Sequence, residues 1–117
     1  MKLISCNIRG CNSRLKERIL KRKIAAENPT IMMIQETKCS KDNLRHLGAK
    51  IWKGRKTIGS HAIGAAGGMG IWWNPLEVSL KFFVATAYSI SVEFHILGTR
   101  VRGCITNIYE PFLAVRK

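Results

Sequence analysis

The sequence predicts an α/β (α+β) fold that begins with a strand–helix–strand unit and continues as antiparallel β-structure. Apolar, strand-like runs at 2–7 and 30–35 flank a stretch at 14–27 whose apolar residues recur at helical spacing. From residue 70 onward, strand-like runs alternate with short turn signals. A length of 117 residues fits one small domain, and an apolar content of 46% argues against disorder.

Capping and breaking residues mark the limits of the first unit. Asn12 or Ser13 can cap a helix over 14–27. Asn28-Pro29 ends that helix, because proline disfavours helical geometry in the residue before it. A strand, a helix and a strand in this order favour a right-handed parallel crossover. The carboxyl ends of the two strands would then lie at the same edge of one sheet.

The rest of the chain is expected to hold one more helix and five further strands. Ser40 can cap a short helix over 40–47, and a short strand is expected over 49–52. Residues 53–68 are expected to form a loop. Its glycine-rich end is interpreted as a flexible connection to the next strand, with phosphate contact as the alternative. Four more strands are expected at 70–73, 77–84, 88–96 and 100–108.

The net charge of +13 is unevenly distributed along the chain. Residues 1–58 hold 15 Lys and Arg against 4 Asp and Glu, whereas residues 59–117 hold 5 against 3. A strongly basic half suits a polyanionic partner, and nucleic acid is the partner that this charge favours. The alternative is a solvated basic surface without a partner.

Cysteine usage and hydropathy favour an intracellular protein. The chain has no C-x-x-C pair and no zinc-finger spacing, so we expect reduced thiols, two of them buried in strands. No apolar run approaches the roughly 18 residues of a membrane span, so no membrane partner is expected. The first residues turn polar too soon for a signal peptide, which favours the nucleus or cytoplasm over secretion. The cysteines are Cys6, Cys11, Cys39 and Cys104.

Each strand of the first unit ends in a residue that can hold a hard metal ion. Asn7 ends the first strand, and Glu36 follows the second. Magnesium prefers oxygen ligands and often binds through one or two carboxylates and several waters. An ionised Glu36 at the end of a buried strand also needs a partner, because burying an unpaired charge is costly. The sequence therefore predicts a metal site at this edge, with a salt bridge of Glu36 as the alternative.

Four short motifs follow one another in the chain: S-C-N-I-R-G at 5–10, I-Q-E-T-K at 34–38, G-G-M-G-I at 67–71 and T-N-I-Y-E-P at 106–111. Each is weak alone. Together they resemble the exonuclease–endonuclease–phosphatase family of magnesium-dependent phosphodiesterases. The resemblance is strongest to the apurinic-type endonuclease domain of LINE-type (non-LTR) retrotransposons.

The resemblance implies a fold, a cofactor and three site residues. The fold is a partial, truncated four-layer α/β sandwich, with residues 1–111 as its amino-terminal part and 112–117 as a divergent tail. Asn7 matches the family's Asn that orients the active-site network, and we also expect it to bind the metal. Glu36 matches the metal-binding Glu, and Tyr109 a Tyr close to the scissile phosphate. The implied cofactor is magnesium, with manganese as a substitute.

Part of the chemistry that phosphodiester hydrolysis requires is missing from the sequence. The reaction needs a base that deprotonates water. The resemblance implies that this base comes from a later Asp-x-Asn segment and a terminal Asp-His pair. The single aspartate is Asp42, and no histidine directly follows it as an Asp-His pair. We expect an inactive fragment of a DNA endonuclease derived from a LINE-type retrotransposon. The alternatives are a basic nucleic-acid-binding module without catalysis and an orphan reading frame with no selected role.

Half of such a sandwich would leave an inner sheet face without its partner. We therefore expect an exposed apolar patch, poor solubility and self-association. The aromatic residues are expected in the core, and base stacking by one tryptophan is the alternative. Asn107 is given no catalytic role. The expected aromatic core residues are Trp72, Trp73, Phe82 and Phe83.

Overall fold

The computed structural model describes residues 1–10, 13–60, 68–86 and 88–109. This part of the chain holds two helices and seven strands. Strands and helices alternate up to the second helix, and all later elements are strands. The strands are β1 (Leu3–Asn7), β2 (Ile31–Gln35), β3 (Lys56–Ser60), β4 (Met69–Trp73), β5 (Val78–Ala85), β6 (Ser89–Ile96) and β7 (Arg102–Ile108), and the helices are α1 (Arg14–Glu27) and α2 (Lys41–Ile51).

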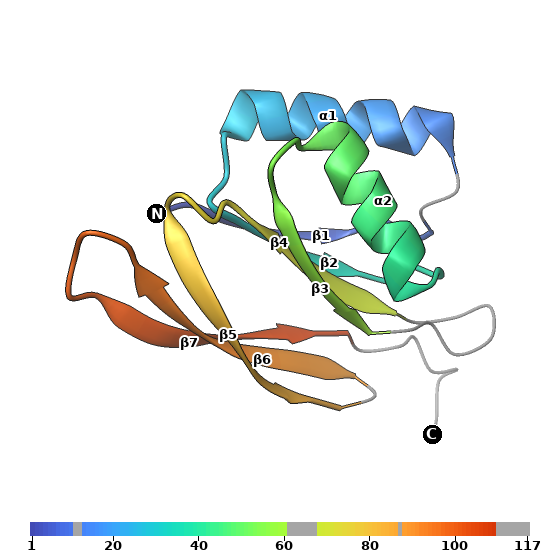
Figure 1. The fold of residues 1–117 in the computed structure, drawn as a ribbon. Coiled ribbons are helices and arrows are strands. Elements are labelled where there is room, and N and C mark those ends of the chain that lie inside the picture. The colour runs from blue at the N-terminus through green and yellow to red at the C-terminus, as the bar shows by residue number, and fades with distance from the viewer. Residues whose placement is uncertain (11–12, 61–67, 87, 110–117) are drawn as a thin grey trace, which may run out of the picture.

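The strands form two sheets. The first has the order β1-β2-β4-β3, with β1 and β2 parallel and the other pairs antiparallel. The second is antiparallel, with the order β5-β6-β7. Figure 1 shows both helices on one face of the first sheet and the second sheet on its other face. The predicted α/β class is confirmed, and so is the parallel pairing of the first two strands.

Helix α1 begins and ends where the sequence predicts. The Ser13 side chain accepts a hydrogen bond from the backbone N–H of Lys16, and Asn28 closes the helix in the left-handed conformation. Leu20 and Ile24 are the buried residues of α1, whereas other apolar residues of the helix face solvent. The helix thus contacts the sheet along a narrow stripe.

Two expected elements of the middle region are wrong. Residues 49–52 do not form a strand, because the apolar spacing of Leu44, Leu47 and Ile51 continues helix α2 to its last turn. Residues 56–60, expected in a loop, form β3. This strand pairs along its whole length with β4, from Lys56 opposite Trp73 to Ser60 opposite Met69.

Two apolar cores lie on the two faces of the first sheet. Trp72 packs between the helices and the sheet, and Trp73 packs between the two sheets. Both indole rings are buried, which confirms them as core residues and excludes base stacking by either. The side chains of Phe82 and Phe83 lie outside the described residues.

The second sheet covers much of the inner face of the first. Val78, Ile90 and Val92 are fully buried between them. The cover does not reach edge strand β1, where Leu3 and Ser5 stay exposed. The expected bare inner face is therefore limited to the β1 edge, and self-association stays a prediction.

The expectation of two cysteines buried in strands is wrong. Cys6 in β1 is half-buried, Cys104 in β7 is exposed, and the buried cysteine, Cys39, lies outside the strands. These three are free thiols, as expected. Cys11 lies outside the described residues. Among those that are described, no helix is long and apolar enough to span a membrane.

Candidate functional site

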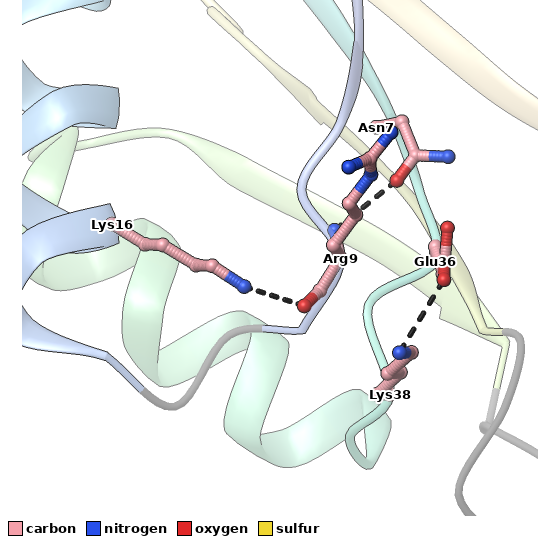
Figure 2. Close-up of polar contacts among 5 residues, drawn as sticks. All are labelled: Asn7, Arg9, Lys16, Glu36 and Lys38. Atoms are coloured by element: carbon pink, nitrogen blue, oxygen red, sulfur yellow. Dashed lines mark hydrogen bonds and ion pairs between the residues drawn. The ribbon is translucent and has the colours of Figure 1, made fainter.

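The structure brings Asn7 and Glu36 together at the carboxyl edge of the first sheet. Asn7 pairs with Gln35 in the parallel register, so Glu36 lies one residue beyond that pair. The Asn7 side chain lies close enough to the Glu36 carboxylate to lower its pKa. The Lys38 ammonium lies 3.4 Å from Glu36 Oε1, and Figure 2 shows these residues grouped around the carboxylate. The salt bridge that the sequence left open as an alternative is thus present.

Asn7 is held in place by the loop that follows β1. Its Oδ1 accepts a hydrogen bond from the backbone N–H of Arg9 at 3.1 Å, which leaves the amide N–H₂ to donate to Glu36. The loop is fixed in turn from α1, because Lys16 Nζ donates to the backbone carbonyl of Arg9 (Figure 2). The Asn7 side chain is thus fixed beside the Glu36 carboxylate.

Backbone strain gathers around the site. Four non-glycine residues in the described part of the chain have positive φ, and three of them are Arg9 at 50°, Glu36 at 57° and Lys38 at 52°. The fourth, Asn28, is a helix cap, where this conformation is common. Non-glycine residues rarely adopt positive φ. Those that do concentrate at functional sites, where the surrounding structure holds them in this conformation. The strain favours a functional role over an ordinary surface salt bridge.

Two backbone hydrogen bonds hold Glu36 in this conformation. The N–H of Gly10 donates to the Glu36 carbonyl at 2.8 Å, and the N–H of Thr37 donates to the Gly68 carbonyl at 3.1 Å. The first joins the loop after β1 to the loop after β2. The second joins the latter loop to the segment that precedes β4. The two loops therefore form one unit.

The surroundings of Glu36 keep its carboxylate ionised. The hydrogen bond from Asn7 lowers the pKa of Glu36 below its ordinary value of 4.5, and the positive charges of Lys38 and Arg9 lower it further. Partial burial of the carboxylate opposes these effects. The side chain stays 21% exposed, so solvent and small ions can reach it.

The donor set fits a magnesium ion held by one carboxylate and water. Glu36 offers an ionised, accessible carboxylate, and Asn7 Oδ1 keeps one free lone pair, both hard oxygen donors of the kind that magnesium prefers. No cluster of three or more His, Cys, Asp or Glu that could hold a metal occurs among the described residues. The Lys38 ammonium now neutralises Glu36, so a metal ion would have to displace it.

Tyr109 lies at the same end of the molecule as Glu36 but in the other sheet. It follows β7, whose carboxyl end points in the same direction as those of β1 and β2 in Figure 1. Its backbone N–H donates to the Tyr88 carbonyl at 2.9 Å, and its half-buried ring packs against the core between the sheets. No hydrogen bond within the described part joins Tyr109 to Glu36.

Asn107 is the residue that sequence reasoning missed. Its Nδ2 donates to the carbonyls of Ile34 at 3.0 Å and Gly70 at 2.9 Å, and its Oδ1 accepts from Gln35 Nε2 at 2.6 Å. The side chain is 1% exposed and ties β7 to both β2 and β4. Asn107 thereby fixes where the end of β7, and Tyr109 beyond it, lies relative to Glu36. A polar residue at an inward-facing position of an alternating strand was the available signal.

The remaining acidic and histidine candidates do not join the site. Asp42 is exposed on α2 and pairs with Arg45 at 3.4 Å. His46 is exposed on the same helix, and His95 contacts the Thr99 carbonyl through Nε2 at 2.8 Å. His61 lies outside the described residues. Among the residues that are described, Glu36 is the one carboxylate at this edge.

No protein-family model and no curated protein sequence matches the chain. Solved structures do match it. The AP endonuclease LMAP from Leishmania major superimposes with a TM-score of 0.66 and 16% identity over 92% of this chain and 39% of its own. The endonuclease domain of TRAS1, a telomere-specific non-LTR retrotransposon, gives 0.65 and 15% over 92% of this chain and 45% of its own. The catalytic domain of Xenopus laevis APE2 superimposes with a TM-score of 0.62 and 19% identity, over 97% of this chain and 46% of its own.

These similarities establish the fold. The chain has the fold of endonuclease/exonuclease/phosphatase proteins, as its motifs led us to expect. It spans less than half the length of each of these three solved structures. Its two sheets correspond to part of that architecture, and the sandwich is not closed.

Proposed function

We propose that the chain is the amino-terminal part of a magnesium-dependent DNA endonuclease of the LINE-retrotransposon type. We further propose that it carries the metal-binding portion of the site and is inactive on its own. The observation that carries this proposal is the meeting of Asn7 with an ionised Glu36 in a strained loop at the carboxyl edge of the first sheet. The fold supports it, since solved structures that share it include AP endonucleases and the endonuclease domain of a retrotransposon.

Each site residue has a distinct part in this proposal. A bound magnesium ion would polarise the phosphate and neutralise developing charge. Glu36 would hold the ion through its carboxylate, and Asn7 would keep that carboxylate oriented and contribute its free lone pair. Lys38, once the metal ion displaces it from Glu36, would be free to pair with the phosphate. Tyr109 offers a phenolic O–H donor from the second sheet.

The same residues explain why we expect no hydrolysis by this chain alone. A nucleophilic water needs a base within hydrogen-bond reach. Glu36 is occupied by its cation, and the single aspartate, Asp42, is paired with Arg45 on the surface of α2. A basic module that binds nucleic acid without cutting it is the second candidate, favoured by the net charge of +13.

Metal titration tests the proposal. Isothermal titration calorimetry with Mg²⁺, and with Mn²⁺ followed by electron paramagnetic resonance, should show one weak site that Glu36→Gln abolishes. Glu93→Gln removes one carboxylate from β6 and is the matched control, which should keep the site. Metal binding that survives Glu36→Gln would contradict the proposed centre.

Plasmid nicking tests the expected inactivity. We expect no magnesium-dependent nicking by the purified chain. Robust nicking that is lost in Glu36→Ala would show instead that these 117 residues complete the site.

A further inference from the structure

A groove between helices α1 and α2 carries a basic cluster outside the candidate site. It lies in the helical layer and has a volume of about 390 Å³. Both helices line it, mainly with cationic side chains. The lining residues are Arg14, Glu17, Arg18, Lys21, Lys50 and Ile51.

The spacing of the α1 cations directs them to the groove. Arg14, Arg18 and Lys21 recur at intervals of four and three, which places them on one flank of a helix. Leu20 and Ile24 occupy the buried stripe beside them. All three cations are exposed, so their charged ends are open to a ligand.

The charge of the groove is not compensated within the described part of the chain. Its one acid, Glu17, pairs with Lys50 at 3.2 Å. No ion pair with Arg14, Arg18 or Lys21 occurs among the described residues, which leaves the groove with a net charge of +3. These cations repel one another, so an anionic ligand would stabilise the groove.

Arg14 of the groove also stands at the unfavourable end of helix α1. Positive charge stabilises the carboxyl end of a helix and destabilises the amino end. Arg14 is the first residue of α1, whereas the last turn has no basic residue. Helix stability therefore gives no reason for this arrangement, but an anion bound near the amino end does.

Helix α1, which lines the groove, also contacts the loop of the candidate site. Lys16, in the first turn of α1, donates to the carbonyl of Arg9 in the loop that holds Asn7 (Figure 2). From Arg14 to Lys21 the helix rises by about 10 Å. That length matches about three phosphates of one strand at roughly 3.4 Å each.

We propose that the α1–α2 groove binds the phosphate backbone of nucleic acid, independently of any metal at Glu36. The inference rests on the proposed function in one respect, the choice of nucleic acid as the polyanion. Contacts to phosphates alone carry no sequence information, so this binding is sequence-independent and strongly salt-dependent.

Fluorescence anisotropy with a labelled 20-base-pair duplex of random sequence tests the groove. EDTA is present throughout, and salt is varied from 50 to 200 mM. The triple variant Arg14→Gln/Arg18→Gln/Lys21→Gln removes three charges while keeping good helix formers. It should weaken binding at least tenfold and flatten the slope of log K against log salt by about 2.7.

The matched control removes the same charge from exposed positions elsewhere. Lys53→Gln/Lys81→Gln/Arg102→Gln should leave the slope within about one unit of that of the unmodified chain. Equal losses in the two triple variants would mean diffuse attraction and would overturn the inference. Absence of DNA binding by the unmodified chain would overturn it as well.

A single variant with the opposite sign covers the case in which the triple variant does not fold. Glu17→Gln removes the acid of the groove and frees Lys50, so duplex affinity should rise about threefold at low salt. An unchanged or lower affinity would contradict phosphate binding in the α1–α2 groove. Because these measurements contain EDTA, a failure of metal binding at Glu36 leaves them unaffected, and the two proposals fail separately.

Discussion

Glu36 joins a strained backbone to a charged side chain, and its ionisation is coupled to the folded state. The pKa of Glu36 is lowered in the folded protein, chiefly by the hydrogen bond from Asn7. A group of this kind stabilises the fold above its unfolded pKa, and that contribution is lost as the pH falls through the lower folded pKa. The relevant window therefore lies below about pH 4.5.

Asn7→Ala should raise the pKa of Glu36 towards its ordinary value. Removing the amide deletes the largest of the effects that lower it, while Lys38 and Arg9 remain. Carboxyl-detected NMR titration of Glu36 measures the change directly. In thermal melts from pH 6 to pH 3, Asn7→Ala should lose less stability below pH 4.5 than the unmodified chain does. A Glu36 pKa that does not change would remove Asn7 from its orienting role.

Asn107 has a structural role that can be measured separately from catalysis. Asn107→Leu would leave the carbonyls of Ile34 and Gly70 and the amide of Gln35 buried without that partner. Unsatisfied buried groups cost about 1–3 kcal/mol each, so we expect a loss of at least about 2 kcal/mol in urea unfolding. Thr106→Ala, which removes an exposed hydrogen bond to Ser91 one residue earlier, should cost under about 1 kcal/mol. Similar losses in both variants would contradict the bridging role.

At the scale of elements, helix α2 packs closely on the sheet at Gly48. A Cβ added at Gly48 would lie 2.7 Å from Trp72 Nε1 and 3.0 Å from Cε2. The helix thus packs directly on the indole ring because position 48 has no side chain. This contact also explains why α2 continues past a glycine.

Gly48→Ala should destabilise the protein although alanine is the better helix former by about 1 kcal/mol. The clash with buried Trp72 should cost about 1–3 kcal/mol beyond that gain. Urea unfolding measures the change, and Ala49→Gly, at an exposed neighbouring position, reports helix propensity alone. A Gly48→Ala variant more stable than the unmodified chain would show that the Trp72 ring can move aside without loss of stability.

The elements that sequence predicts best are those with local signals. Helix α1 is marked by its N-cap residue, Ser13, and by Pro29 just after its end. The strands from residue 69 onward are marked by strand-like apolar runs and by the turn residues between them. Strand β3 has one strongly apolar residue, Ile58, so its strand conformation depends on pairing with β4. Asn7 and Glu36 were predicted to meet because parallel pairing alone requires it. The positive φ of Glu36 and the reach of Asn107 depend on long-range hydrogen bonds, which no local pattern reveals.

For the whole molecule, apolar residues that face solvent suggest association. Leu3 is 40% exposed on edge strand β1, and Ile108 is 63% exposed near the end of edge strand β7. Unpaired edges with apolar side chains invite pairing with other chains. Leu3→Lys/Ile108→Lys should therefore shift the protein towards monomer in light scattering. Leu76→Lys, in the exposed turn after β4, is the matched control and should not. A monodisperse monomer of the unmodified chain would contradict the expectation.

The bridge from Asn107 has a consequence for the order in which the protein is made. Gln35 and Ile34 lie 72 and 73 residues before Asn107 in the chain. During synthesis the first strand–helix–strand unit leaves the ribosome early, with Asn7 and Glu36 already adjacent in its topology. The buried groups that Asn107 satisfies must wait until β7 has emerged, about 4–14 seconds later at about 5–20 residues per second. During that interval the Gln35 amide and the Ile34 carbonyl have no partner from β7.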